Sequence, residues 1–280
     1  MGVRRDARDA LAASGLRPRK RWGQHFLCDP GVARRIVETA GIGPGSAVLE
    51  IGPGLGALTG ALAERAARLY LVEIDPGLAV RLEERYADRP QVRVVAGDVL
   101  ELPLATLVRE PEVTVVANLP YNITTPILFR LLALRERFPR AVVMVQREVA
   151  TRLAAKPGGR DWGVLPALVQ TFAEVRVAFG VSRRSFLPPP RVESAVVDVR
   201  WSLAPRVDVG DLETYRQVVR AAFGQRRKTL RNALGALATA RGLDARALTA
   251  AFATAGIDPA TRAERLSTAD FARLARAFEG

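Results

Sequence analysis

The chain has 280 residues, of which 49% are hydrophobic, enough for one large domain and a small one and too many for global disorder. One cysteine, Cys28, and one histidine, His25, exclude an internal disulfide and a zinc site of the Cys/His type, and no nucleophile motif accompanies His25. The net charge of +13 predicts a polyanionic partner, in the first place nucleic acid, although a GC-rich genome would also enrich arginine.

No stretch approaches the roughly 20 apolar residues of a membrane helix. The N-terminal residues also lack the apolar segment of a secretory signal. We therefore expect a cytoplasmic protein without a membrane partner. Residues 1–28 are predicted to form a basic arm. A helix is expected to follow from Asp29, a good N-cap, with Pro30 at its first position.

From residue 46, apolar strand patterns alternate with helical patterns. The strands are apolar on both faces, which is typical of a parallel sheet covered by helices on both sides. Two late strands, 174–181 and 194–201, flank the proline run FLPPPRV and predict a hairpin-like antiparallel addition. The other strands are predicted at 46–51, 69–74, 92–98, 113–118 and 141–146, and the helices at 55–67, 76–87, after Thr125 and at 147–155.

After Trp201 the pattern changes to helices alone. The segment LAPRVDVG is interpreted as a linker, and no strand pattern follows it. These features predict a basic arm over 1–28, a main α/β domain over 29–203 and a small helical domain over 204–280. The helices of the last domain are expected at 211–223, 226–241, 244–254 and 267–278.

The segment LEIGPGLGAL, at 49–58, places Gly52, Gly54 and Gly56 between a strand and a helix. Glycine allows a tight turn there and lets a ligand approach the main chain. The spacing differs from the G-x-G-x-x-G of dinucleotide enzymes, and the lysine of a phosphate-binding loop is absent. With Glu50 beside it, the loop suits a ligand that has an amino-acid part and no phosphate. An ordinary strand-to-helix turn is the alternative.

Acidic residues end the next two strands. Glu73 can accept hydrogen bonds from both ribose hydroxyls of a nucleoside, whereas Asp75 precedes Pro76 and is better explained as a helix N-cap. Asp98 can accept from the exocyclic amine of an adenine, although Gly-Asp is also common in turns. Ligands bind at the carboxyl edge of parallel sheets, so these acids and the glycine loop together predict a pocket for S-adenosylmethionine.

The fourth strand ends in Asn118-Leu119-Pro120-Tyr121. An exocyclic adenine amine is a poor nucleophile, because its lone pair is delocalised into the ring. The Asn118 side-chain oxygen and the Leu119 carbonyl can hold its two N–H groups and direct the lone pair at a methyl group. Pro120 stiffens the backbone, and Tyr121 offers a face on which the base can stack. A simple strand-terminal turn is the alternative.

Seven segments in this order resemble the small-subunit (16S) ribosomal RNA adenine N6,N6-dimethyltransferases. They are RWGQHFLCDP, LEIGPGLGALT, VEID, GDVL, NLPYNITTP, FLPPPRVESAVV and FGQRRKTLRNAL. The resemblance covers residues 19 to about 235. The resemblance implies a Rossmann-like S-adenosylmethionine-dependent methyltransferase with a mostly parallel seven-stranded sheet, a small all-helical C-terminal domain and no metal. It also implies dimethylation of two adjacent adenines near the 3′ end of 16S rRNA.

The same resemblance implies roles for individual residues. The basic arm would fold onto the cofactor site. Cofactor contacts would come from His25, Leu27, Gly52, Glu73 on the ribose, Asp98 on the adenine, and Asn118. The target base would be held by Asn118, Leu119 and Tyr121, with Phe186 stacked on its other face. His25 stands where many members have Asn, and Thr124 where many have Ser; both retain hydrogen-bonding capacity.

The run GQRRKTLRN, at 224–232, predicts phosphate contacts with RNA from Arg226, Arg227, Lys228 and Arg231. A solvated helix face is the alternative for these four residues. The partner implied is 16S rRNA in a pre-assembled small ribosomal subunit, bound by a monomer. The alternative functions are a large-subunit (23S) rRNA adenine methyltransferase of the macrolide-resistance type and a non-catalytic ribosome assembly factor. The proline triplet and the RRKTLRN segment favour the small-subunit enzyme.

Overall fold

The chain forms two compact units, which the computed structural model describes over residues 24–225 and 227–279. The first unit contains the described residues up to Ala150 together with Glu174–Trp201, and the second contains Thr151–Ala173 and the described residues from Ser202 onward. The segment 151–173 therefore belongs to the unit of the C-terminal helices, whereas the sequence placed it in the main domain. Of the predicted basic arm, residues 1–23 lie outside the described part.

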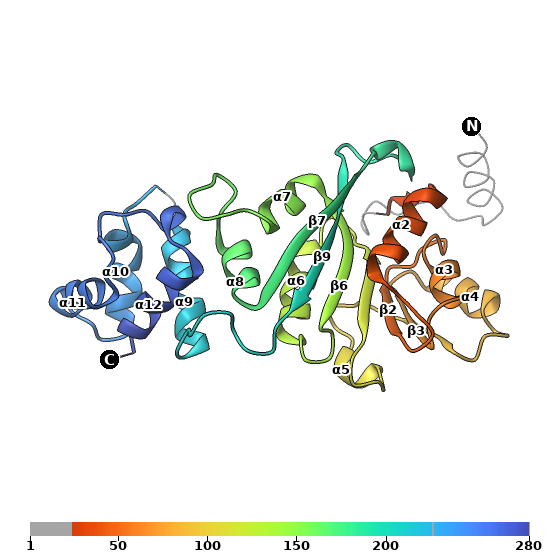
Figure 1. Cartoon of the computed structure of the whole chain (residues 1–280), viewed down its shortest axis with the longest axis horizontal. Helices are drawn as coiled ribbons and strands as arrows, with labels where there is room; N and C mark the ends of the chain where they lie inside the picture. The colour runs from red at the N-terminus through yellow and green to blue at the C-terminus, as the bar shows by residue number, and fades with distance from the viewer. Residues whose placement is uncertain (1–23, 226, 280) are drawn as a thin grey trace. The chain divides into compact units, whose positions relative to one another are not determined.

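A seven-stranded sheet forms the centre of the first unit, with strand order β4-β3-β2-β5-β6-β9-β7 (Figure 1). Pairs β2–β3, β3–β4, β2–β5 and β5–β6 are parallel, and β9 runs antiparallel to β6. The predicted α/β class, with a mostly parallel seven-stranded sheet and a late antiparallel addition, is confirmed. The strands are β2 (Ala47–Ile51), β3 (Arg68–Glu73), β4 (Val92–Ala96), β5 (Thr114–Asn118), β6 (Arg140–Gln146), β7 (Ala173–Val181) and β9 (Ser194–Trp201).

The strand order reverses direction between β2 and β5. From β2 the chain proceeds outward through β3 to β4, then returns to the other side of β2 and continues through β5 to β6. In open parallel sheets such a reversal leaves a crevice at the carboxyl ends of the two central strands, where ligands bind. The loops that follow Ile51 and Asn118 therefore flank the expected ligand crevice.

Helices α2, α3 and α4 pack on one face of this sheet, and α6 lies on the other side of it (Figure 1). Side chains alternate between the two faces of a strand. Val48, Leu69, Leu71, Val116 and Met144 accordingly belong to one buried cluster with the apolar residues of these helices. The helices of the first unit are α2 (Pro30–Ala40), α3 (Thr59–Ala63), α4 (Pro76–Arg85), α5 (Leu104–Leu107), α6 (Thr124–Ala133) and the start of α7 (Arg147–Leu153).

A two-stranded ribbon, which the sequence pattern did not predict, accompanies the main sheet. In it β1 (Phe26–Leu27) pairs antiparallel with β8 (Phe186–Leu187), in the register Phe26↔Leu187 and Leu27↔Phe186. Two residues are too few for a period to show in sequence. The expected helix over 55–67 is also shorter, because the glycine turn continues to Leu58 before α3 begins.

The second unit is helical over its described residues. Its helices pack around buried aromatic side chains: the Tyr215 hydroxyl lies 2.6 Å from Thr171 Oγ1, and Trp162 Nε1 donates to the Leu266 carbonyl at 2.9 Å. Across residues 24–225 and 227–279, no helix is long and apolar enough to cross a membrane. The helices are α8 (Val164–Phe172), which was not predicted, α9 (Leu212–Gly224), α10 (Leu230–Ala240), α11 (Ala245–Ala255) and α12 (Thr268–Ala277).

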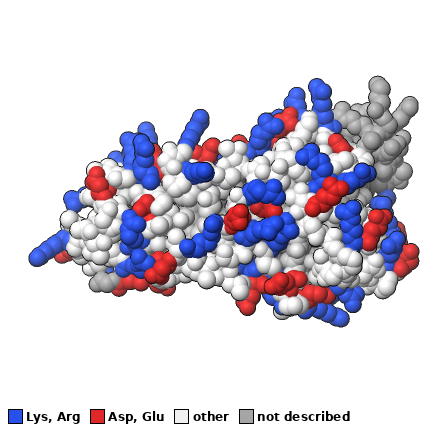
Figure 2. Space-filling model, viewed as in Figure 1, with Lys and Arg blue, Asp and Glu red and all other residues white. Residues whose placement is uncertain are grey.

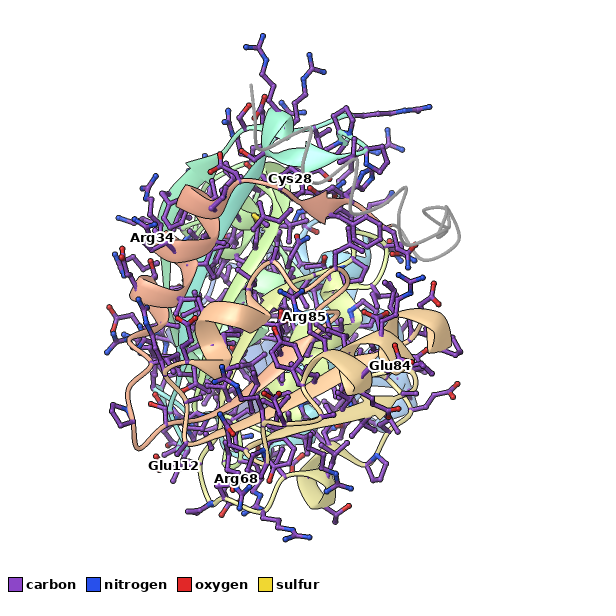
Figure 3. The ribbon with its side chains drawn as sticks, turned by 90° about the vertical axis from the view of Figure 1, so that its right-hand side faces the viewer. Cys28, Arg34, Arg68, Glu84, Arg85 and Glu112 are labelled. Atoms are coloured by element: carbon purple, nitrogen blue, oxygen red, sulfur yellow. The ribbon has the colours of Figure 1, made fainter. Side chains whose placement is uncertain are left out.

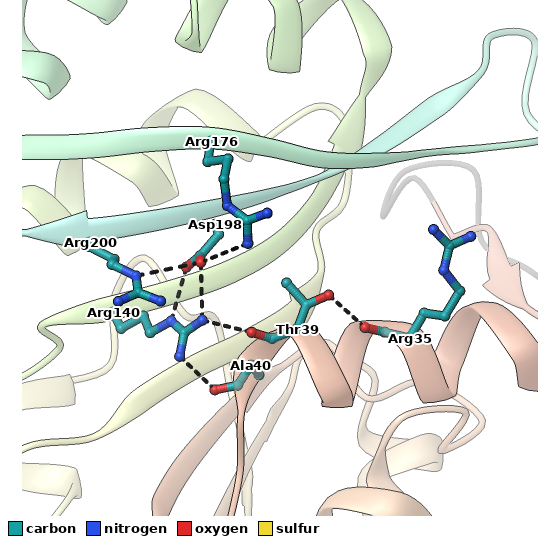
Figure 4. Close-up of polar contacts among 7 residues, drawn as sticks. All are labelled: Arg35, Thr39, Ala40, Arg140, Arg176, Asp198 and Arg200. Atoms are coloured by element: carbon teal, nitrogen blue, oxygen red, sulfur yellow. Dashed lines mark hydrogen bonds and ion pairs between the residues drawn. The ribbon is translucent and has the colours of Figure 1, made fainter.

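A buried carboxylate, Asp198 on β9, joins the sheet to helix α2 (Figure 4). Arg140 donates to both of its oxygens, from Nε at 2.9 Å and from Nη2 at 3.0 Å. The same guanidinium donates to the carbonyls of Thr39 at 2.7 Å and Ala40 at 2.8 Å, at the end of α2. One arginine thus satisfies the helix carbonyls and the buried acid together.

Two further arginines approach the same acid: Arg176 Nη2 at 3.4 Å and Arg200 Nε at 3.6 Å from Oδ2. Burial alone would raise the pKa of Asp198, but the hydrogen bonds and charge of Arg140, together with the other two cations, bring it below its ordinary value of 3.8. The ionised form is therefore stabilised in the folded chain.

We predict that Asp198→Asn lowers the free energy of unfolding by about 3 kcal/mol at neutral pH, because it leaves Arg140 without its buried counter-charge. A depressed pKa contributes stability above the unfolded pKa, and that contribution is lost as the pH falls through the folded pKa. The difference in free energy of unfolding between the unaltered chain and Asp198→Asn should therefore become smaller as the pH is lowered below 3.8. Urea unfolding across this range measures it; the exposed Asp88→Asn should change stability by less than about 0.5 kcal/mol.

Candidate functional site

A cavity opens at the carboxyl ends of β2, β3 and β5, at the crevice that the strand order produces. Its empty volume is about 710 Å³, including space open to solvent. Seven of the predicted site residues line it, from four separate segments of the chain: His25, Leu27, Gly52, Glu73, Asn118, Leu119 and Tyr121. The structure thus brings together residues found from the strand-end pattern and His25 and Leu27, which only the family resemblance identified.

Left-handed glycines shape the floor of this cavity. Gly52, Gly54 and Gly56 have φ angles of 65°, 58° and 85°, a region that other L-residues rarely adopt. A Cβ on Gly54 would also lie 3.0 Å from the Phe26 ring. At Gly52 the nearest atom to such a Cβ is 4.0 Å away, so the missing side chain leaves open space in the cavity.

Glu73 fixes the glycine loop to the end of β3. Its Oε2 accepts from the Gly54 N–H at 3.0 Å, and its Oε1 accepts from the Asp75 N–H at 2.9 Å. Burial raises the pKa of Glu73, and these two backbone donors offset part of the rise. Glu73 lines the cavity, and a carboxylate has about four acceptor positions, so it can accept from ligand hydroxyls besides these backbone donors. Asp75 is the N-cap of α4, as predicted.

Glu50 lies one layer deeper in the same cavity. It pairs in register with Leu71 and Val116, two residues before the strands end at Glu73 and Asn118. Its residue is 1% exposed, and its Oε2 has no hydrogen-bond partner within the described chain. Burial raises the pKa of Glu50 to about 8.

Asn118 is oriented by the segment before β1. Its Nδ2 donates to the His25 carbonyl at 3.0 Å. A carbonyl only accepts, so this bond determines which way the amide is turned and leaves Oδ1 as an acceptor directed elsewhere. The Leu119 side chain is buried, while its backbone N–H donates to the Met144 carbonyl at 3.1 Å. These contacts hold the strand end rigidly against its neighbours.

Tyr121 is held by its hydroxyl and its ring. The hydroxyl lies 2.6 Å from Ser194 Oγ, and burial raises the pKa of Tyr121. The ring stacks on that of His25, with centroids 5.6 Å apart and planes inclined by 28°. His25 Nδ1 lies 2.8 Å from the Pro188 carbonyl, so in the neutral ring Nδ1 carries the proton. One face of Tyr121 is thus covered and the ring cannot rotate freely.

Two predicted site residues are not brought to the lining of this cavity. Asp98 follows β4, where its Oδ1 accepts from the Leu100 N–H at 2.8 Å in a local turn. Phe186 is fully buried in β8 and belongs to the apolar cluster under α2. Its ring has no free face in this conformation, so stacking on a base requires the β1–β8 ribbon to move.

Of the predicted RNA contacts, Arg226 lies outside the described residues. Arg227, Lys228 and Arg231 are exposed near the start of α10, and Arg231 Nη2 donates to Thr249 Oγ1 at 3.0 Å. On the face that Figure 2 shows, basic side chains alternate with acidic ones.

Several functional contacts were not identified from the sequence. Ser194, which holds Tyr121, has no local signal, because it lies 73 residues further along the chain. Arg85, labelled in Figure 3, lies beside the glycine loop: its Nη1 donates to the Leu55 carbonyl at 3.4 Å and would lie 3.2 Å from a Cβ on Gly56. Glu50 was noted as a neighbour of the glycines, but its burial becomes visible only in the sheet. Residues 24–225 and 227–279 contain no cluster of His, Cys, Asp and Glu suited to a metal ion.

We predict that Gly54→Ala lowers the free energy of unfolding by about 2 kcal/mol, since alanine must adopt a left-handed conformation against the Phe26 ring. Gly60→Ala is the matched control, because Gly60 lies inside α3 and its new methyl would meet no atom closer than 4.0 Å. We expect that control to be neutral or slightly stabilising. Urea unfolding of both variants measures the difference; equal effects would contradict this account of the loop.

Comparisons with known proteins agree with this geometry. The family model described as ribosomal RNA adenine dimethylase matches residues 15–279. A ribosomal RNA small subunit methyltransferase A from Moorella thermoacetica is 47% identical over 274 residues, which cover 95% of this chain and 94% of that protein. The protein of the same name from Syntrophotalea carbinolica is 44% identical over 263 residues, covering 94% and 97%.

Two solved structures share the fold. A dimethyladenosine transferase from Plasmodium falciparum superposes with a TM-score of 0.76 at 26% identity, over 89% of this chain and 96% of that one. The 23S rRNA methyltransferase ErmE gives a TM-score of 0.69 at 30% identity, over 91% and 100%. Because the family model matches residues 15–279, which is nearly the whole chain, the chain belongs to the ribosomal RNA adenine dimethylase family.

Proposed function

We propose that this protein uses S-adenosylmethionine to dimethylate the N6 amines of two adjacent adenines near the 3′ end of 16S rRNA. The observation that carries the proposal is the orientation of Asn118 beside the glycine-loop cavity, with Nδ2 on the His25 carbonyl and Oδ1 left as an acceptor. Such an acceptor can bind an exocyclic N–H group. The names of the relatives that are 44–47% identical support the small-subunit substrate.

The cavity fits this cofactor on two grounds. The space left by Gly52 lets a ligand approach the main chain, and the Glu50 carboxyl, whose Oε2 has no hydrogen-bond partner within the described chain, suits a positively charged amino-acid end. Glu73 would accept from the ribose hydroxyls. Asp98 would receive the adenine amine once its side chain turns toward the ligand. When bound, the cofactor supplies an electrophilic methyl group on sulfur.

The chain's own residues would position the target amine. Asn118 Oδ1 and the Leu119 carbonyl would each accept one N–H, which localises the nitrogen lone pair toward the methyl donor. Tyr121 would present to the base the ring face that His25 does not cover. No strong base is needed, because the proton leaves after attack. This arrangement works through positioning and electrostatics, which suits a site with one histidine.

The RNA partner we propose is the pre-assembled small subunit, bound by a monomer in the cytoplasm. Arg226, Arg227, Lys228 and Arg231 would contact phosphates. The large-subunit alternative is less well supported, since the 23S enzyme ErmE is 30% identical and the small-subunit relatives are 44–47% identical. A non-catalytic assembly factor would not require a complete cofactor cavity.

We predict that labelled S-adenosylmethionine yields dimethyladenine with small subunits that lack the modification, and not with large subunits or DNA; naked 16S rRNA tests the need for assembly. Asn118→Ala should lower the rate roughly 100-fold or more, because one of the two acceptors is lost. The matched control is Asn122→Ala, an exposed neighbour. Transfer to large subunits would contradict the substrate, and an active Asn118→Ala enzyme would contradict the role of the amide.

We further predict that Phe186 matters most for the second methyl transfer. A monomethylated amine has one N–H, so the base then depends more on stacking than on the two acceptors. Phe186→Leu, chosen because Phe186→Ala would cost about 3–5 kcal/mol of stability, should raise the ratio of monomethyl to dimethyl product severalfold. Mass spectrometry of digested rRNA measures that ratio. An unchanged ratio in a folded variant would count against this role.

A further inference from the structure

The Glu50 carboxyl is buried away from bulk solvent. It lies on β2 between Leu71 of β3 and Val116 of β5, below the layer of polar side chains at the strand ends. Its residue is 1% exposed and yet lines the cavity. The family's reaction, as derived above, assigns no proton to it.

No cation faces this carboxyl from any element packed against it within the described chain. Glu73 on β3 is a second acid, and its charge raises the pKa of Glu50 further. The Thr59 hydroxyl of α3 approaches the same carboxyl and lowers its pKa through a side-chain hydrogen bond, which offsets part of the effect of burial. The Tyr86 hydroxyl, at the end of α4, is buried and has no hydrogen-bond partner within the described chain. Arg85 is turned to the Leu55 carbonyl and the ring of Tyr86.

His25 lies on the remaining side of the cavity, and its Nδ1 is engaged by the Pro188 carbonyl. A buried carboxylate without a counter-charge costs far more than a neutral acid, so burial keeps the proton on Glu50 at neutral pH. Its pKa of about 8 expresses this balance. Its Oε2 has no hydrogen-bond partner within the described chain, and no cation among the causes of its pKa offsets its charge.

We propose that Glu50 is a neutral acid in the ligand-free cavity and releases its proton to solvent when the α-ammonium group of the cofactor enters. The inference rests on the proposed use of S-adenosylmethionine. The O–H bond of Glu50 breaks, its proton passes to the buffer, and the ammonium keeps its three protons. The cation supplies the counter-charge that the protein lacks, so the carboxylate is formed only with the ligand bound.

The sign of the pH dependence follows from this exchange. Only the ionised acid pairs with the ammonium, and below a pKa of about 8 that form is a minority. Affinity should therefore rise roughly tenfold per pH unit between pH 6 and pH 7 and level off above pH 8. At pH 7 about one proton should leave for each ligand bound.

The test is calorimetric titration of the full chain with S-adenosylhomocysteine at pH 7 in buffers of different ionisation enthalpy. The slope of the observed enthalpy against buffer enthalpy gives the number of protons released. 5′-Methylthioadenosine, which has the adenosine and sulfur but no amino-acid end, should bind with almost no release. Equal release with both ligands would assign the proton to a group near the ribose, such as Glu73, and would overturn the proposal.

Two variants complete the test. Glu50→Gln should bind S-adenosylhomocysteine more weakly at pH 8, with no proton release and no pH dependence between pH 6 and 8. Glu64→Gln, an exposed acid directly after α3, should behave as the unaltered chain does. If Glu50→Gln fails to fold, the comparison of the two ligands on the unaltered chain still decides the matter.

The outcomes separate this inference from the proposed function. Binding of S-adenosylhomocysteine without proton release would overturn the role of Glu50 and leave the cofactor assignment standing. Absence of binding by either ligand, in a chain shown to be folded, would overturn the cofactor assignment and the inference together.

Discussion

The hydrogen bond from Asn118 Nδ2 to the His25 carbonyl is the contact on which the arrangement of the site depends. It joins residues 93 positions apart and connects the end of β5 to the segment that enters β1. Through it the amide oxygen is directed away from the backbone, and His25 is placed against the ring of Tyr121. Asn118, at the end of its strand, is thus held with its amide oxygen free to accept a hydrogen bond, and the β1 segment lines the cavity.

Because the central strands are parallel and in register, the polar residues of the cavity lie in two layers, one at the strand ends and one two residues below them. In each strand every second side chain faces α2, α3 and α4. These side chains form the apolar layer, and the last of them on the three central strands are Glu50, Glu73 and Asn118. Glu73 and Asn118 reach the rim, where backbone donors and solvent are near. Glu50 remains one step below, among aliphatic neighbours. Burial raises the pKa of both acids, to about 8 for Glu50, and backbone donors offset part of the rise for Glu73.

A second buried acid of the first unit, Asp198, has the opposite surroundings, because cations lie beside it. Asp198 is as buried as Glu50, yet three arginines surround it and its pKa is lowered. The acid that joins β9 to α2 is paired with arginines, whereas no cation appears among the causes of the pKa of Glu50 in the cavity. A buried acid paired with arginines suits a structural role, and a buried acid without a counter-charge suits the cation binding that we propose for Glu50.

Local pattern by itself determined the strands, the glycine turn, the acids at the strand ends and the membership of one sheet, because period, turn chemistry and strand polarity act over a few residues. Tertiary structure alone decided the amide orientation of Asn118, the hold of Ser194 on Tyr121, the burial of Phe186 and the assignment of 151–173 to the second unit. The contacts of Asn118 with His25 and of Tyr121 with Ser194 join residues that are 93 and 73 positions apart. Their partners are selected by packing, on which no short stretch of sequence reports.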